Sequence, residues 1–307
     1  MCYSGQVVTQ WREYSRKLGS RISLTDFIDL YVFRSQDKRV RIPKAVDAAF
    51  GSPADDTEHK LQALIEAFGA QQTVETEQEL FKQRKRLADA ERTLQTKPTK
   101  AATESKRIAG NKIEWCLGKL DDLRRPDLKD RDSRFFPGWY VPVIVMENGQ
   151  RVVKPMRYQS RQAGKPAFYD TKYPGTYNAR RENLEGFWKG LFGHTHGLMV
   201  VSRFYENVDR DGKNVVLEFN PRTGEEMLVA CLWSRWTGPD SEALLSFAAI
   251  TDEPPPEVAA AGHDRCIIPI KAEHVDAWLN PDPKDLAVQY AILDDRQRSY
   301  YEHRMAA

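Results

Sequence analysis

The chain has 307 residues, with 46 Lys and Arg against 44 Asp and Glu, so its formal net charge is only +2. This balance excludes a protein that is basic over its whole surface, and it leaves a local basic groove as the way to bind nucleic acid. The first twenty residues lack the apolar core of a signal peptide, and no stretch is apolar enough to span a bilayer. We therefore expect a cytoplasmic protein with no membrane partner.

The four cysteines are Cys2, Cys116, Cys231 and Cys266, and they are widely spaced without a CxxC pair. This spacing argues against a structural zinc site and against a disulfide framework. The pair His194 and His196 would point to one face of a strand, as two metal ligands can, but no third ligand follows at a matching spacing. The sequence predicts no metal and no cofactor.

The chain opens with short elements and continues into a long helical stretch. Residues 2–9 form a strand-like run, and Leu24 to Phe33 has the spacing of a helix. From about Asp55 to Leu123 the sequence is rich in charged residues, with leucines every seven residues at Leu80, Leu87 and Leu94. Pro98 breaks this pattern, so residues 55–123 predict a helical hairpin or a short coiled coil.

From Phe135 onward the pattern changes to β-structure. Two apolar runs flank Glu147-Asn148-Gly149, which is typical of a β-hairpin. Further strands are expected over residues 198–204, 214–219, 227–233 and 244–250, and short helices over residues 276–280 and 285–291. The fold class is predicted to be α+β, with a β-rich core of curved sheets or an open barrel with flanking helices. Residues 1–21 and 131–307 would form this core, and residues 22–130 a largely helical insertion.

Cys2 stands directly behind the initiator Met1. Removal of Met1 would leave a residue whose amine and thiol sit on adjacent carbons. The reference pKa values of about 7.7–8.0 for such an amine and about 8.5 for a thiol allow both groups to react near neutral pH. With an aldehyde, the amine forms a Schiff base and the thiol then closes a thiazolidine ring. The competing interpretation is a small residue buried in a strand.

Three further segments stand in order along the chain: Tyr177-Asn178-Ala179-Arg180-Arg181-Glu182, Ser202-Arg203-Phe204-Tyr205-Glu206-Asn207, and Gly262-His263-Asp264-Arg265-Cys266-Ile267-Ile268-Pro269. With Cys2, they resemble the SOS response-associated peptidase (SRAP) family, whose patterns are N-A-R-x-E, F-Y-E-W and H-x-R-M-P. The resemblance covers residues 1–20 and roughly 135–280. It departs from the family at Arg203, where glycine is usual, and near Arg157, where the W-G-L segment is replaced.

The resemblance implies that Cys2 captures the aldehyde of an abasic site in single-stranded DNA as a thiazolidine crosslink, which shields the lesion. Glu206 and His263 would move protons, and Asn178 would hold the reacting atoms in position. Arg180 and Arg157 are the residues predicted to bind nucleic acid. The family is thought to expose Cys2 by removing Met1 itself, as a peptidase would, and the protein is expected to associate with the nucleoid when it is bound to DNA.

Each assignment has a structural alternative. Glu206 could be a surface glutamate at the end of a strand, His263 a cap on its loop, Asn178 a turn residue, and Arg180 the partner of Glu182 in an ion pair. Trp188, Trp233 and Trp236 could stack on bases or fill the core.

Two other functions compete with crosslinking. One is a peptidase or amidase that uses the N-terminal cysteine as its nucleophile, and the other is a non-catalytic module that binds DNA or protein. The hairpin itself is expected to be solvated. Its alternatives are docking of a protein partner, dimerisation, or extension of the DNA-binding groove through Lys82, Arg84, Lys85 and Arg86.

Overall fold

The structure is a computed structural model and describes residues 4–238 and 243–306. The chain divides into two compact units. One unit joins residues 1–54 to residues 129–307, and the other consists of residues 55–128. Within the described residues, no helix is both long and apolar enough to cross a membrane.

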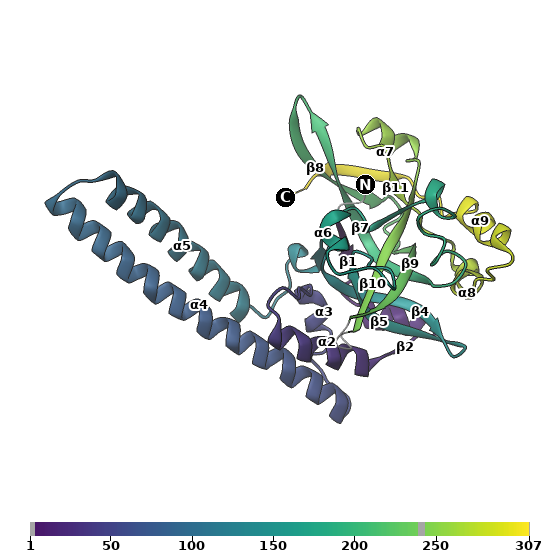
Figure 1. Cartoon of the computed structure of the whole chain (residues 1–307), viewed down its shortest axis with the longest axis horizontal. Helices are drawn as coiled ribbons and strands as arrows, with labels where there is room; N and C mark the ends of the chain where they lie inside the picture. The colour runs from purple at the N-terminus through teal and green to yellow at the C-terminus, as the bar shows by residue number, and fades with distance from the viewer. Residues whose placement is uncertain (1–3, 239–242, 307) are drawn as a thin grey trace. The chain divides into compact units, whose positions relative to one another are not determined.

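The larger unit is built around five strands that close into a barrel (Figure 1). These strands are β4 (Tyr140–Glu147), β5 (Gln150–Tyr158), β7 (His196–Arg210), β9 (Met227–Thr237) and β10 (Ala243–Asp252). β4 pairs antiparallel with β5 and β7, β7 pairs antiparallel with β9, and β9 with β10. β10 then pairs with β5 in parallel and completes the ring. The prediction of an α+β fold with a barrel-like core is confirmed.

Two turns of the sheet, one of them the predicted turn at residues 147–149, have the backbone that tight β-hairpins require. Between β4 and β5, Asn148 and Gly149 have φ angles of 52° and 74°. Between β7 and the next strand, β8 (Lys213–Pro221), Asp211 and Gly212 have φ angles of 57° and 73°. Positive φ at both central residues matches the right-handed twist of the flanking strands. The hairpin predicted at residues 147–149 is therefore confirmed.

Short strands extend the barrel at its edges. They are β1 (Ser4–Val7), β2 (Arg21–Ile22), β3 (Arg134–Phe135), β6 (Asn178–Arg180), β11 (Cys266–Ile267) and β12 (Tyr301–Met305). β1 lies between β3 and β7, and it is antiparallel to both. β6 and β11 both pair with the C-terminal half of β10, and β12 pairs with β8.

Short helices flank this sheet. They are α1 (Trp11–Lys17), α2 (Leu24–Gln36), α3 (Lys44–Ala48), α6 (Tyr169–Lys172), α7 (Pro256–Ala260), α8 (Val275–Leu279) and α9 (Leu286–Asp294), with single 3-10 turns η1 (Asp130–Ser133), η2 (Arg181–Asn183) and η3 (Ala272–His274). The helices predicted from Leu24 and near residues 276–280 and 285–291 correspond to α2, α8 and α9.

The boundary of the insertion differs from the prediction. The sequence predicts that the insertion starts at residue 22, but residues 22–54 belong to the larger unit, and the helical unit begins at Asp55. The reason is an aromatic cluster that joins α1 to α2 and to the end of α3. Phe27 stacks on Trp11 with ring centroids 5.5 Å apart, and Phe50 meets Phe27 edge-on at 5.2 Å. Such buried rings contribute much of the apolar area of a core.

The second unit is a helical hairpin of α4 (Asp56–Thr96) and α5 (Lys100–Arg124). Asp55 and Thr99 cap the two helices, because their side chains accept hydrogen bonds from Glu58 N at 2.9 Å and Ala102 N at 3.2 Å. Leu80 packs between the helices with Cys116 and Leu120. The sequence pattern predicted this hairpin, including the break that contains Pro98.

Candidate active site

A buried carboxyl and an imidazole meet at the end of the barrel. Glu206 lies on β7 and is 0% exposed, and His263 lies in the loop between α7 and β11 and is 8% exposed. His263 Nε2 and Glu206 Oε2 are 3.2 Å apart. The structure thus brings together two predicted proton-transfer residues that are 57 positions apart in the sequence. The alternative of a surface glutamate is wrong.

The other imidazole nitrogen determines what this pair can do. His263 Nδ1 lies 2.8 Å from the carbonyl oxygen of Arg265 and 3.3 Å from its amide nitrogen. Nδ1 donates to that carbonyl in one tautomer of the ring and accepts from the amide in the other, and in both a hydrogen bond between Nε2 and Glu206 Oε2 holds one proton, on either atom. Burial lowers the pKa of His263, and the Arg265 carbonyl partly opposes this shift. The pair is suited to transferring a single proton.

Strand β1 connects this pair to the start of the chain. Ser4 on β1 is paired with Tyr205, the residue before Glu206. Tyr205 also donates a hydrogen bond to Gln6 Oε1 at 2.6 Å, and Arg134 donates to Ser4 Oγ at 3.1 Å. The Arg134 guanidinium in turn lies 3.8 Å from the centroid of the Tyr205 ring. Cys2 lies outside the described residues.

Asn178 lies on β6, whose parallel pairing with β10 places it beside Ala249. Its side chain is 5% exposed, and neither its oxygen nor its nitrogen has a hydrogen-bond partner among the described residues. Thr251, two residues further along β10, is 1% exposed, and its hydroxyl group likewise has no partner there. Buried amides normally have partners, so an unsatisfied one indicates a group that a bound molecule would satisfy. The described contacts do not join Asn178 to Glu206 or His263.

The two arginines predicted to bind nucleic acid have different surroundings. Arg180 on β6 keeps 48% of its side chain exposed, and its contact with Glu182 is long at 3.9 Å. Arg157 on β5 is 14% exposed and donates to Asp170 Oδ2 at 2.8 Å. Burial raises the pKa of Asp170, but Arg161 and Arg157 outweigh it and hold that pKa below its ordinary value. The side chain of Arg157 therefore already forms an ion pair inside the protein.

Sequence reasoning assigned no role to Arg265 and Cys266, which lie in the same segment as His263. Arg265 donates hydrogen bonds from two guanidinium nitrogens to the Glu182 carboxylate. Glu182 is therefore paired more closely with Arg265 than with Arg180. Burial, reinforced by the charge of Glu206, raises the pKa of the Cys266 thiol well above its usual range. The H-x-R spacing within the third segment is a sequence feature that could have pointed to Arg265. No feature of the sequence points to Cys266.

The described cysteines are poor nucleophiles. Cys116, Cys231 and Cys266 are buried and form no disulfide with one another. Burial raises the pKa of the Cys231 and Cys266 thiols far beyond the range in which a thiolate forms near neutral pH. The described part of the chain therefore contains no thiol suited to nucleophilic attack.

His196 and two of the three tryptophan candidates have structural roles. His196 is 2% exposed, accepts from Gly193 N at 2.9 Å and bonds the Trp278 carbonyl through Nδ1 at 3.0 Å. Both ring nitrogens are thereby occupied, so His196 is not placed to bind a metal. Trp188 and Trp236 are 3% and 6% exposed and belong to the core.

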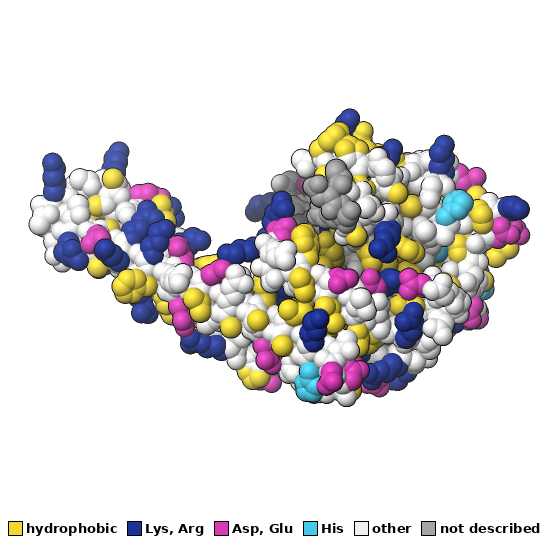
Figure 2. All heavy atoms as spheres, turned by 60° about the horizontal axis from the view of Figure 1, so that its bottom comes forward, with side chains coloured by type: hydrophobic (Ala, Val, Ile, Leu, Met, Phe, Trp, Pro, Cys, Tyr) yellow, Lys and Arg dark blue, Asp and Glu magenta, His cyan; other side chains and the backbone are white. Residues whose placement is uncertain are grey.

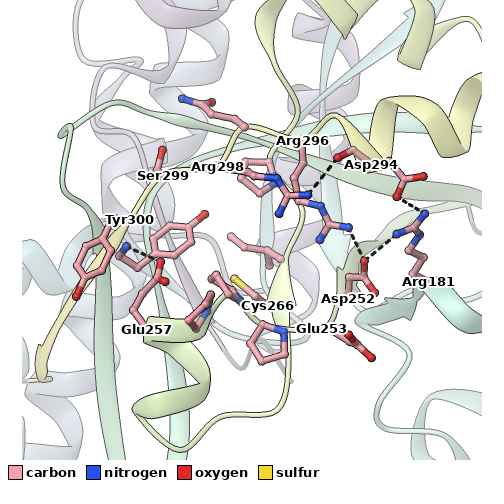
Figure 3. A pocket seen from close by; sticks show the side chains of 17 residues that line it. Arg181, Asp252, Glu253, Glu257, Cys266, Asp294, Arg296, Arg298, Ser299 and Tyr300 are labelled. Carbon is pink, nitrogen blue, oxygen red and sulfur yellow. Dashed lines mark hydrogen bonds and ion pairs between the residues drawn. The ribbon is translucent and has the colours of Figure 1, made fainter.

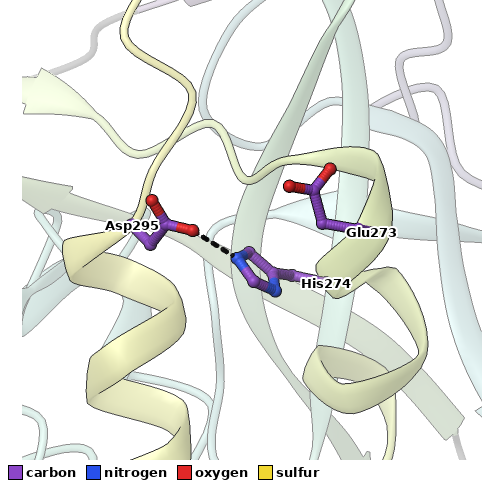
Figure 4. A group of neighbouring side chains, drawn as sticks. All are labelled: Glu273, His274 and Asp295. Atoms are coloured by element: carbon purple, nitrogen blue, oxygen red, sulfur yellow. Dashed lines mark hydrogen bonds and ion pairs between the residues drawn. The ribbon is translucent and has the colours of Figure 1, made fainter.

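Two other groups of polar residues lie outside this site. A cavity of about 530 Å³ is lined by Cys266 and by ion pairs such as Arg181 with Asp252 at 3.1 Å (Figure 3). At the surface, Glu273, His274 and Asp295 are close enough to share a cation (Figure 4). Asp295 is already bonded by His274 at 2.8 Å and Lys271 at 2.6 Å. We assign no metal to this cluster.

Comparison with known proteins agrees with the motifs. Three crystal structures of proteins are similar to this chain: one from Bordetella bronchiseptica (18% identity, TM-score 0.47, covering 57% of this chain and 87% of that one), one from Bacteroides thetaiotaomicron (11%, 0.49, 57% and 78%) and a phage-related protein from Bordetella bronchiseptica (16%, 0.44, 60% and 85%). The comparison with curated proteins found no match. The family model of the SOS response associated peptidase (SRAP) matches residues 92–305, more than half of the chain, and the chain belongs to that family.

Proposed function

We propose that the protein binds single-stranded DNA and forms a covalent thiazolidine crosslink with abasic sites through Cys2, once Met1 has been removed. The observation that supports this most directly is the buried contact of 3.2 Å between Glu206 and His263. Glu206 of this pair follows directly on Tyr205, which pairs with Ser4, two positions after Cys2 in the sequence.

The proposed reaction has two steps. The amine of Cys2 first adds to the aldehyde carbon of the ring-opened sugar, and loss of one water leaves an imine. The Cys2 sulfur then adds to the imine carbon while the nitrogen takes up the thiol proton, and the five-membered ring closes. Glu206 and His263 move the protons that these steps require, and Asn178 provides an amide with unused hydrogen-bonding capacity to position the sugar. The reaction needs no cofactor.

Incubation of the purified protein with single-stranded DNA containing one abasic site tests this proposal. We expect a band that survives denaturation, that is absent with Cys2→Ser, and that has the mass of protein plus DNA minus one water. Intact mass of the free protein should show that Met1 is gone. Active protein that retains Met1 would contradict the mechanism. Hydrolysis of an amide substrate without a crosslink would favour the N-terminal-nucleophile peptidase instead.

A second prediction separates the two arginines. Arg180→Gln should weaken binding of single-stranded DNA several-fold and reduce the slope of log affinity against log salt by about 0.7, because one exposed phosphate contact is lost. Arg157→Gln should leave that slope unchanged and lower stability by about 1–3 kcal/mol, because it leaves Asp170 with one arginine fewer. Fluorescence anisotropy at several salt concentrations, with denaturant unfolding alongside, measures both effects. A reduced slope for Arg157→Gln alone would reverse the assignment.

A further inference from the structure

The charges of the helical hairpin are separated along its length. Residues 82–112, which contain its turn and the adjoining parts of both helices, carry ten Lys and Arg and three Asp and Glu, a net charge of +7. The remainder of the unit, residues 55–81 and 113–128, carries four Lys and Arg and eleven Asp and Glu, a net charge of −7. Basic side chains gather around the turn, at the left in Figure 2. We call residues 82–112 the basic end of the hairpin.

The acids of the basic end are neutralised within it. Each of the three pairs with one cation of the same segment, at distances of 2.5–3.2 Å; the pairs are Asp89 with Arg92, Glu91 with Lys106, and Glu104 with Arg107. Seven exposed cations of the basic end therefore have no carboxylate partner among the described residues, and four of the seven lie between residues 82 and 86. The positive charge of this segment is thus not balanced by the fold.

Three of these cations are neighbours on one side of α4. Lys85 and Arg86 come three and four residues after Lys82, and side chains at these spacings lie next to one another on a helix surface. Like charges at such positions destabilise a helix, and all three side chains are exposed. An acid at one of these positions would stabilise α4, so the cluster is better explained by an anion that binds there than by the fold.

The same three side chains line a hollow of about 490 Å³ between α4 and α5. The facing wall is the start of α5, which contributes small side chains: Thr99, Ala101, Ala102 and Ser105. Arg86 reaches across and donates from Nε to Ser105 Oγ at 2.9 Å, which leaves its other two guanidinium nitrogens for an anion. Asp89 also lines the hollow, but it is paired with Arg92. Long cationic side chains opposite small ones leave room for a phosphate group, which a guanidinium can bind with two hydrogen bonds.

Nucleic acid is the partner whose chemistry fits the basic end. Within residues 82–112, all of which the structure describes, no large apolar side chain is exposed. A protein interface has an apolar core, and a helix that lies on a membrane inserts an apolar face, so neither partner fits this segment. A phosphate backbone requires positive charge at close spacing. Residues 82–96 of α4 extend for about 21 Å, the length of about six phosphates on one strand of a duplex.

We propose that the basic end of the hairpin is a second DNA-binding surface, which holds the phosphate backbone without reading the sequence of the bases. Lys82, Lys85 and Arg86 provide its central contacts. The inference rests on the proposed function, because it takes DNA as the substrate, but it gives the hairpin a role in affinity and none in the reaction. Loss of this surface should weaken DNA binding and leave the rate of crosslinking unchanged once DNA is saturating.

The triple variant Lys82→Gln, Lys85→Gln and Arg86→Gln, made in the full-length protein, tests this surface. Fluorescence anisotropy at several salt concentrations measures its affinity for a single strand without an abasic site and for a duplex of the same length. We expect affinity to fall about tenfold or more, because three phosphate contacts are lost. The slope of log affinity against log salt should decrease by about 2 for the single strand or about 2.7 for the duplex. The larger loss identifies the form of DNA that the hairpin holds.

The matched control removes three cations from the larger unit that are already bonded to carboxylates, with the same change in net charge; they are Lys17, Arg222 and Lys271, each replaced by Gln. Both the affinity and the salt slope of this control should stay at the wild-type values. Circular dichroism should show the same helix content in every variant, because glutamine is a good helix former. The hairpin variant should be at least as stable as wild type, since like charges have been removed from α4.

Equal DNA affinity in the wild type and the hairpin variant overturns the inference, whether or not a crosslink forms. So does a loss of binding to vesicles that contain phosphatidylserine without a loss of DNA affinity, which would identify a membrane as the partner. A slower crosslinking rate of the hairpin variant at saturating abasic DNA would also contradict it, because the hairpin would then act in the reaction. A loss of affinity in the hairpin variant, together with a wild type that forms no crosslink, would contradict the chemistry of Cys2 and still support the hairpin surface.

Discussion

Glu206→Gln should slow formation of the abasic-site crosslink by about 100-fold or more, the effect expected for loss of a positioned general acid or base. Glutamine keeps the size of the side chain and its contact with His263 but cannot exchange a proton. Because Glu206 is completely buried beside a histidine whose pKa is lowered by burial, water cannot readily take over the transfer. Single-turnover rates on abasic single-stranded DNA, measured from denaturing gels, give the effect directly.

Glu218→Gln is the matched control for this experiment. Glu218 is also a buried glutamate, on the neighbouring strand β8, but it bonds Arg203 at 3.0 Å and Arg304 at 2.9 Å rather than a histidine. We expect its crosslinking rate to stay within a few-fold of wild type. Equal losses of crosslinking rate in both variants would show that the buried carboxylates near β7 act only by stabilising the fold. An unchanged rate in Glu206→Gln would remove Glu206 from the mechanism.

The protein should lose stability as the pH falls from about 6.5 towards 3, and His196 should account for much of the loss. Burial lowers the pKa of His196 to about 3, although its bond to the Trp278 carbonyl acts in the opposite direction. Between these values the unfolded chain binds a proton that the folded chain does not, so unfolding becomes more favourable as pH decreases. The slope approaches about 1.4 kcal/mol per pH unit below pH 6, and the loss amounts to about 2.3 kcal/mol between pH 6.5 and 4.5.

Denaturant unfolding at a series of pH values, compared between wild type and His196→Asn, isolates this contribution. Asparagine retains a donor near the position of Nδ1 but does not titrate, so the variant should be less stable at neutral pH and should have a smaller pH slope. The change in the free energy of unfolding per pH unit, and not its value at one pH, shows whether His196 contributes. Identical slopes in the two proteins would mean that His196 is protonated in the folded state.

The helical hairpin and the β-hairpin turns could be predicted from the sequence because their signals are local. Leu80, Leu87 and Leu94 define a helix face within one segment, and Asn148-Gly149 has the backbone freedom that a tight turn needs. The extent of the insertion was predicted less well. Residues 22–54 are helical in part, but packing of Phe27 and Phe50 with Trp11, and of Leu30 with strands of the barrel, places them in the larger unit.

The sequence by itself determined the family and the identity of the candidate site residues, because short motifs carry the side chains that the chemistry requires. Only the tertiary structure decided what surrounds those side chains. In the folded protein Glu206 is buried against His263, and Asn178 has no hydrogen-bond partner among the described residues. Arg180 is exposed, whereas Arg157 forms an ion pair with Asp170. Burial and ion pairing depend on contacts between residues far apart in the chain, and these contacts exist only once the barrel has closed.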